Sequence, residues 1–137
     1  MKKLQRIKYG DLAPKQQEVY NFQKSAAVLA EFGFNCIKLA DDWQGADFLA
    51  YHKDGNTTLK IQLKGRVEIN KKYKGRDIYM NFRINETWYL VPHDELIKLV
   101  PRSWRESSSW KKDGKYSTPK PSQDLLKKLS PYALEGA

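Results

Sequence analysis

The sequence predicts an α+β domain with an α/β/α core: a mixed central sheet, an N-terminal helix, and a short helix after the last core strand. Three observations support this class. A helical segment that begins at Pro14 comes first, several short runs of alternating apolar and polar residues follow, and Pro92 separates the last run from a second helical segment. The 137 residues suffice for one domain with a core, and we expect a single domain.

The N-terminal third combines a helix with a strand. Residues 1–13 form a short basic lead, and Pro14 suits the first turn of a helix that runs to about Phe32 and is closed by Gly33. Residues 34–40 read as a strand, and residues 41–45 read as a turn.

A hairpin comes next, with strands at residues 45–51 and 58–65 around the turn 54–56. Two further strands are expected near residues 67–70 and 78–84, followed by a strand at 87–91 that ends at Pro92. The remaining expectations are a helix at 94–100, a basic extension at 102–137 that contains aromatic residues, and within it a helix capped by Ser122 that runs through Leu129.

Composition indicates a polyanionic partner. The net charge is +9, and 12% of the residues are aromatic, including four Trp and eight Tyr. This combination favours a folded domain with a basic surface that binds nucleic acid. The single Cys36 excludes an internal disulfide, and no apolar run approaches the length of a membrane span or signal peptide. We therefore expect a cytoplasmic protein without a membrane partner.

The hairpin carries the most informative residues. Alternation on its second strand places Leu59, Ile61 and Leu63 on one face, and Lys60, Gln62 and Lys64 on the other. Asp47 lies on the preceding strand. A carboxylate, an amide oxygen and an ammonium can therefore meet across the hairpin, which is what metal-assisted phosphodiester cleavage requires.

The chain here resembles the PD-(D/E)XK nuclease superfamily, in the variant that carries Gln in place of the second acid. The resemblance rests on Asp47, Gln62 and Lys64, on the strings Gly-Ala-Asp-Phe and Ile-Gln-Leu-Lys-Gly around them, and on the order of elements over roughly residues 14–100. Small homing endonucleases with a Gln-variant site and Holliday-junction resolvases are the nearest functional analogues. The resemblance implies a restriction-endonuclease-like sheet and a DNA endonuclease.

It also implies roles for individual residues. Asp47 would bind Mg²⁺, for which Mn²⁺ would substitute, together with the Gln62 side chain and the Leu63 carbonyl. Lys64 would orient or help to deprotonate the attacking water. Glu18, which falls on the apolar face of its helix, would be a second metal ligand or would hold a metal-bound water. Cutting both strands of a duplex would require a homodimer or homotetramer.

The expected DNA-binding residues are basic and follow or lie beside the motif: Lys60, Arg66, Lys71, Lys72, Lys74 and Arg76. A second basic cluster, at residues 102–120, contains Trp104, Trp110 and Tyr116. These aromatic residues suit stacking on nucleic acid, although Trp104 equally suits a place in the core.

Several alternatives stay open at this point. The motif could be the solvated face of an ordinary hairpin, Glu18 could be a first-turn acid that stabilises its helix, and Asp41 or Asp42 could replace Asp47. The protein as a whole could be a non-catalytic nucleic-acid-binding module, or a subunit of a larger nuclease or defence complex. His52 and His93 match no zinc spacing, and Asp94 and Glu95 read as first-turn helix acids only.

Overall fold

A five-stranded mixed sheet forms the centre of the protein. The structure is a computed structural model that describes residues 2–135 of the chain. The strand order is β1-β2-β3-β5-β6, and all neighbours are antiparallel except β3 and β5, which are parallel. The strands are β1 (Phe34–Trp43), β2 (Ala46–His52), β3 (Thr58–Leu63), β5 (Ile78–Ile84) and β6 (Thr87–Pro92). The prediction of an α+β fold with a mixed central sheet is confirmed.

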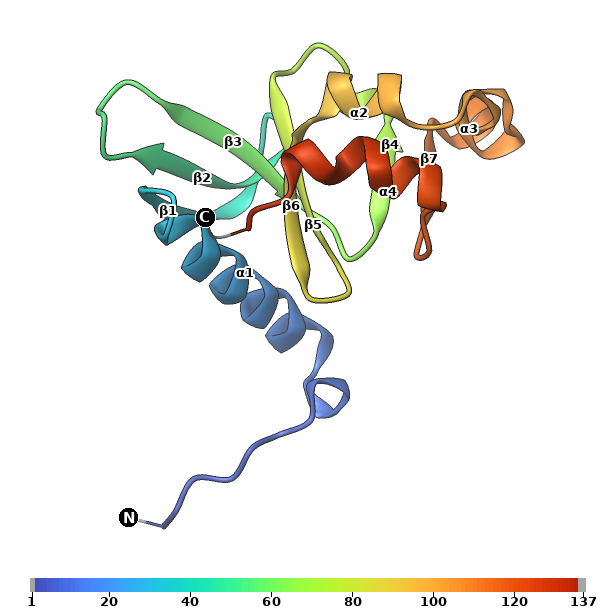
Figure 1. The fold of residues 1–137 in the computed structure, drawn as a ribbon. Helices are drawn as coiled ribbons and strands as arrows, with labels where there is room; N and C mark the ends of the chain where they lie inside the picture. Colours follow the sequence, from blue (N-terminus) through green and yellow to red (C-terminus); the bar gives the residue numbers. More distant parts are fainter. Residues whose placement is uncertain (1, 136–137) are drawn as a thin grey trace.

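Helix α1 (Pro14–Ala30) covers one face of this sheet (Figure 1). Leu29 is fully buried against Phe48, Ala50 and Ile61 of the sheet. Ser25 Oγ donates a hydrogen bond to Asn81 Oδ1, which joins the helix to β5 inside this layer. Gly33 has φ +89° and reverses the chain into β1, as expected from a glycine at the end of a helix.

The opposite face of β5 and β6 carries the larger core. It is covered by α2 (His93–Leu99), α4 (Gln123–Leu129) and a small antiparallel sheet of β4 (Val67–Asn70) and β7 (Lys115–Thr118). The predicted helix after the last core strand is α2. Ser122 Oγ accepts a hydrogen bond from Leu125 N and so caps α4, as predicted.

The remaining elements are short. They are the 3₁₀ turns η1 (Tyr9–Asp11), η2 (Lys71–Tyr73) and η4 (Ser130–Tyr132), the helix α3 (Arg102–Glu106) and the π-helical turn η3 (Ser109–Asp113). Trp104 and Trp110, each 7% exposed, belong to the larger core. Residues 102–135 therefore pack into the body of the domain, and neither indole is available for stacking on nucleic acid.

The expected turn at residues 41–45 is shorter than predicted. β1 runs to Trp43 with an irregular register between Lys38 and Trp43, and only Gln44 (φ 52°) and Gly45 (φ 89°) form the turn. Two consecutive left-handed residues make the tight hairpin turn that suits twisted antiparallel strands. Asp42 Oδ1 accepts a hydrogen bond from Gly45 N, so this acid fixes the turn from the end of the strand.

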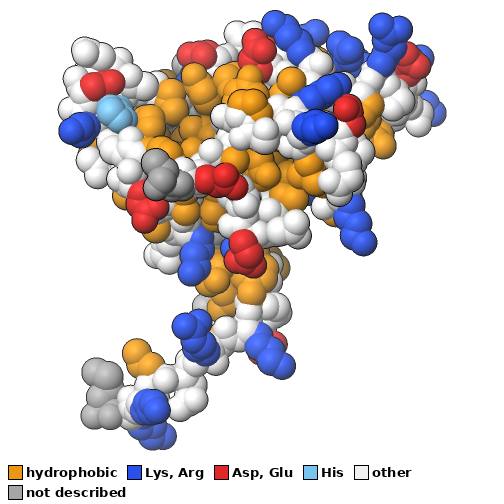
Figure 2. Space-filling view, in the orientation of Figure 1, with side chains coloured by type: hydrophobic (Ala, Val, Ile, Leu, Met, Phe, Trp, Pro, Cys, Tyr) orange, Lys and Arg blue, Asp and Glu red, His pale blue; other side chains and the backbone are white. Residues whose placement is uncertain are grey.

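Within residues 2–135, no helix combines the length and the apolar character needed to span a membrane. Lys and Arg side chains are conspicuous along the N-terminal arm and along the rim of the molecule above α2 and α3 (Figure 2). The four basic residues of the β4–β5 connection are exposed: Lys71, Lys72, Lys74 and Arg76.

Candidate active site

The site lies where β2 begins and β3 ends. The register of the two strands pairs Phe48 with Ile61, and one further step places Asp47 across from Gln62. Because neighbours across a ladder share a face, both side chains start from the face opposite α1. Asp47 is half-buried, and Gln62 is 6% exposed.

Asp47 is held in place by local geometry on both sides. Gly45 allows the preceding turn to lie close to the core, since a Cβ at this position would come within 3.2 Å of Tyr73 Cδ1. On the other side, Leu63 N donates a 2.9 Å hydrogen bond to Asp47 Oδ2. The carboxylate is therefore fixed at the last residue of β3.

Lys64 leaves the sheet directly after this point. Its backbone N still donates to Asn81 O at 2.9 Å, while its side chain turns toward β4. The ammonium lies 3.5 Å from Glu68 Oε2 and 5.9 Å from the centroid of the Tyr73 ring. Glu68 therefore forms an ion pair with Lys64 beside the site.

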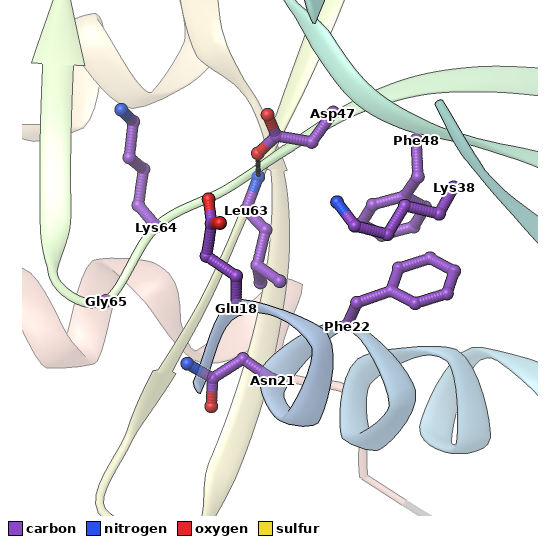
Figure 3. A pocket seen from close by; sticks show the side chains of 9 residues that line it. All are labelled: Glu18, Asn21, Phe22, Lys38, Asp47, Phe48, Leu63, Lys64 and Gly65. Atoms are coloured by element: carbon purple, nitrogen blue, oxygen red, sulfur yellow. Dashed lines mark hydrogen bonds between the residues drawn. The ribbon is translucent and has the colours of Figure 1, made fainter. Parts of the chain in front are cut away.

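A cavity of about 140 Å³ brings these groups together with α1 (Figure 3). Two acidic and two basic residues contribute to its wall: Glu18, Asp47, Lys38 and Lys64. The other lining residues are Asn21, Phe22, Phe48, Leu63 and Gly65. Of the predicted catalytic residues, the structure therefore brings Glu18, Asp47 and Lys64 to one cavity.

Glu18 reaches the cavity from α1. Its side chain is 64% exposed and lies 3.5 Å from Lys15 Nζ. Figure 3 shows its carboxylate directed from the helix toward the part of the cavity that Asp47 and Leu63 line. This exposed carboxylate is accessible to a cation in the cavity.

Gln62 does not line this cavity. Its Oε1 is buried and has no hydrogen-bond partner within residues 2–135, and the same holds for the Tyr73 hydroxyl. A buried polar atom without a partner is costly, so such an atom calls for a water or a cation. The amide oxygen beside Asp47 therefore fits the predicted metal-ligand role, which stays a prediction.

Burial raises the pKa of the Asp47 carboxyl, and the nearby Asp42 adds to the increase. The Leu63 N–H and the positive charges of Lys64 and Lys38 oppose it. The Tyr73 hydroxyl has a raised pKa for similar reasons, burial first and the Glu68 charge second. Negative charge is thus poorly solvated at this end of the sheet, and a bound cation would relieve the cost.

The donor set decides which cation fits. No group of three His, Cys, Asp or Glu residues in the described part of the chain could hold a metal ion. An ion here would use the Asp47 carboxylate with the neutral oxygens of Gln62 and Leu63, and Glu18 from α1. Oxygen donors with few carboxylates suit Mg²⁺, which usually keeps several waters and takes further oxygens from substrate phosphates.

Three further residues of this region escaped the sequence analysis: Glu68, Tyr73 and Lys38. Glu68 is the one acid among the basic residues between Lys64 and Arg76, and this isolation is the signal in the sequence that could have found it. Tyr73 lies in a basic connection, where nothing in the sequence indicates that it is 1% exposed. Lys38 enters only because β1 is placed beside β2.

The six predicted DNA-binding residues differ in their surroundings. Lys60 Nζ donates to Arg76 O at 2.6 Å, and Arg66 donates to Ser117 O at 3.4 Å, so both bind the backbone of this chain. In the connection, Lys71 lies 5.3 Å from the Trp110 ring and Lys72 lies 5.2 Å from the Tyr73 ring. Lys74 and Arg76 are exposed beside them.

The start of α2 supports this basic connection at both ends. Buried His93 accepts a hydrogen bond from Asn70 N at Nε2 (3.0 Å), and Asp94 Oδ2 accepts one from Gly75 N (3.0 Å). Asp94 is therefore more than the first-turn acid that the sequence suggested. The Lys71–Gly75 segment is held as a defined structure on the surface.

Neither a protein-family model nor a curated protein matches the sequence. Among solved structures, the protein is similar to Hjc of Archaeoglobus fulgidus, a Holliday junction resolvase from an archaeal hyperthermophile. The identity is 14%, the match covers 76% of this chain and 90% of that chain, and the TM-score is 0.49. A similarity at this sequence identity and TM-score concerns the fold alone and assigns no activity to this protein.

Proposed function

We propose that this protein is a divalent-metal-dependent endonuclease that hydrolyses phosphodiester bonds in DNA. The carrying observation is that Asp47, Glu18 and Lys64 line one cavity, beside an exposed basic connection. Asp47 would hold Mg²⁺ together with the Gln62 amide oxygen, the Leu63 carbonyl and Glu18. When bound, the metal would supply positive charge against the scissile phosphate.

Residues of the chain would orient the metal ligand, contact the phosphate and position the attacking water. The Leu63 N–H keeps the Asp47 carboxylate in one orientation. A phosphate oxygen would compete with Glu68 for Lys64, whose ammonium would then offset developing charge and orient the attacking water. The exposed Glu18 carboxylate would complete the metal site as a ligand or would hold a metal-bound water. The basic connection would bind neighbouring phosphates.

A non-catalytic DNA-binding module is the second candidate, and one observation favours it. Within residues 2–135, no group of three His, Cys, Asp or Glu residues could hold a metal ion, and the proposed ligand Gln62 is uncharged. A site with weak metal affinity could retain phosphate binding without cleavage.

Plasmid nicking separates the two candidates. The protein would be incubated with duplex, single-stranded and branched DNA in Mg²⁺, in Mn²⁺ and in EDTA. The endonuclease proposal predicts cleavage that depends on the metal. DNA that is shifted in a gel but intact under every condition would favour the binding module.

We further propose a homodimer or homotetramer, because cutting both strands of a duplex requires two sites. Exposed apolar side chains on β1 and β2 offer a surface for self-association: Ile37 is 51% exposed, Trp43 48% and Tyr51 42%. Light scattering coupled to size-exclusion chromatography measures the mass. A monomer at the concentrations used for cleavage would contradict this proposal.

A further inference from the structure

A second cavity adjoins the candidate active site. It has a volume of about 200 Å³ and lies between the N-terminal turn η1 and the β5–β6 hairpin. The two cavities have part of their lining in common, namely Asn21, Leu63, Lys64 and Gly65. The residues that line only the second cavity are Tyr9, Arg83 and Trp88.

The two cavities differ in charge. The first has two carboxylates, Glu18 and Asp47, in its wall. The second has no acid among its lining residues and two cations, Lys64 and Arg83. The first therefore suits a metal ion together with a phosphate, and the second suits an anion alone.

Arg83 is prepared for such an anion. It is exposed and pairs across the hairpin with Trp88, and its guanidinium carbon lies 5.6 Å from the centroid of the indole, which is buried. Arg83 forms no ion pair within residues 2–135. A guanidinium that lies over an aromatic ring keeps its N–H groups available for a phosphate.

Tyr9 and Asn21 form the other wall. Asn21 Nδ2 donates a 2.8 Å hydrogen bond to the Tyr9 hydroxyl, and Gln17 Nε2 donates to Tyr9 O at 3.2 Å. These contacts attach η1 to α1 and leave the Tyr9 side chain 41% exposed. An exposed aromatic ring beside two cations suits the sugar or base that accompanies a phosphate.

We propose that the second cavity binds the phosphate of the nucleotide adjacent to the scissile one on the same DNA strand. Arg83 is its main contact, and Lys64 lies between the two phosphates. The identity of the ligand rests on the proposed function, but phosphate binding at Arg83 needs neither cleavage nor a metal.

Thymidine 3′,5′-bisphosphate is a suitable probe because it carries two phosphates on one sugar, and thymidine 5′-monophosphate carries one. The full chain is titrated with each in EDTA, and affinity is followed by NMR with the Trp88 indole N–H as local reporter. The wild type should bind the bisphosphate more tightly. Arg83→Ala should weaken that binding at least about tenfold, as for loss of a charged hydrogen bond.

Two variants serve as controls. Lys53→Ala removes one exposed positive charge from the β2–β3 turn, outside both cavities, and should leave the affinity unchanged. Arg83→Lys keeps the charge but loses the planar fork, so it should recover only part of the affinity. Bisphosphate binding that is equal in wild type and Arg83→Ala, or a Trp88 indole signal that does not move, would overturn the proposal.

Two further arms separate related ideas. The oligonucleotide d(TpTpTpT) should bind more tightly than the bisphosphate, and a preference for the bisphosphate would contradict a strand as ligand. Asp47→Ala should retain the Arg83-dependent binding in EDTA. If the wild type fails to cleave DNA but shows Arg83-dependent binding, the endonuclease proposal is refuted and the proposed phosphate site stands. If the wild type cleaves DNA but its phosphate binding does not depend on Arg83, only the proposed phosphate site is refuted.

Discussion

The basic connection allows a quantitative prediction about DNA binding. Lys71, Lys72 and Lys74 are exposed, and their backbone is fixed at both ends by His93 and Asp94. If each lysine contacts one phosphate, the triple replacement by Ala should lower the slope of log affinity against log salt by about 2.7, at about 0.9 per contact. Specific and nonspecific DNA should be affected about equally.

The size of the effect is large enough to measure. Between roughly 50 and 200 mM salt, the wild type should lose about 40-fold more affinity than the triple variant. Fluorescence anisotropy on a labelled duplex in EDTA gives both slopes. A charge-matched control replaces Lys53, Lys98 and Lys127, which are exposed on other elements. Equal slopes for the wild type and the connection variant would refute the reasoning and direct attention to residues 102–120.

Three more predictions concern the site. Gln62→Glu should raise metal affinity, measured by calorimetry, whereas an unchanged titration would mean that Gln62 binds only a neighbour. Asp47→Asn should stabilise the metal-free protein toward urea at pH 7, because burial raises the pKa of Asp47 in the folded state. The wild type then loses stability as the pH rises from about 3.9 through the folded pKa of Asp47, so the stability difference between Asp47→Asn and the wild type should vanish below about pH 3.9. A variant less stable than the wild type at pH 7 would contradict this. Tyr73→Phe removes a buried hydroxyl without a partner within residues 2–135 and should stabilise the protein by about 1–3 kcal/mol in thermal unfolding. The control Tyr51→Phe, at an exposed ring, should change the stability little. A destabilised Tyr73→Phe variant would show that the hydroxyl is bound.

The hairpin could be predicted because its information is local. Alternation correctly separated Leu59 and Ile61, whose face packs against α1, from Gln62 on the other face, and the strand bounds of β4 and β5 agree with the expected ones. Such patterns report which face is apolar, and they do not name the neighbouring strand. The parallel pairing of β3 with β5 and the pairing of β4 with the distant β7 were therefore not predictable.

The candidate site likewise contains residues that the sequence could predict and residues that it could not. Asp47, Gln62 and Lys64 come from one hairpin, so their spacing is visible in the sequence. Glu68 and Tyr73 join them only because the chain folds back after Gly65, and a basic connection gives no sign of a buried tyrosine. Trp104 had two equal interpretations, since aromatic residues among cations are typical of both cores and nucleic-acid surfaces.

The most direct test of the central claim compares two nearby acids. Asp47→Ala removes the proposed metal ligand, while Asp41→Ala removes an exposed carboxylate of β1 that the sequence offered as an alternative. In Mg²⁺, the account predicts that Asp47→Ala loses plasmid cleavage by at least about a hundredfold, with the fold intact by circular dichroism, and that Asp41→Ala cuts normally. Lys64→Ala should behave like Asp47→Ala. Cleavage by Asp47→Ala at the wild-type rate would contradict the account.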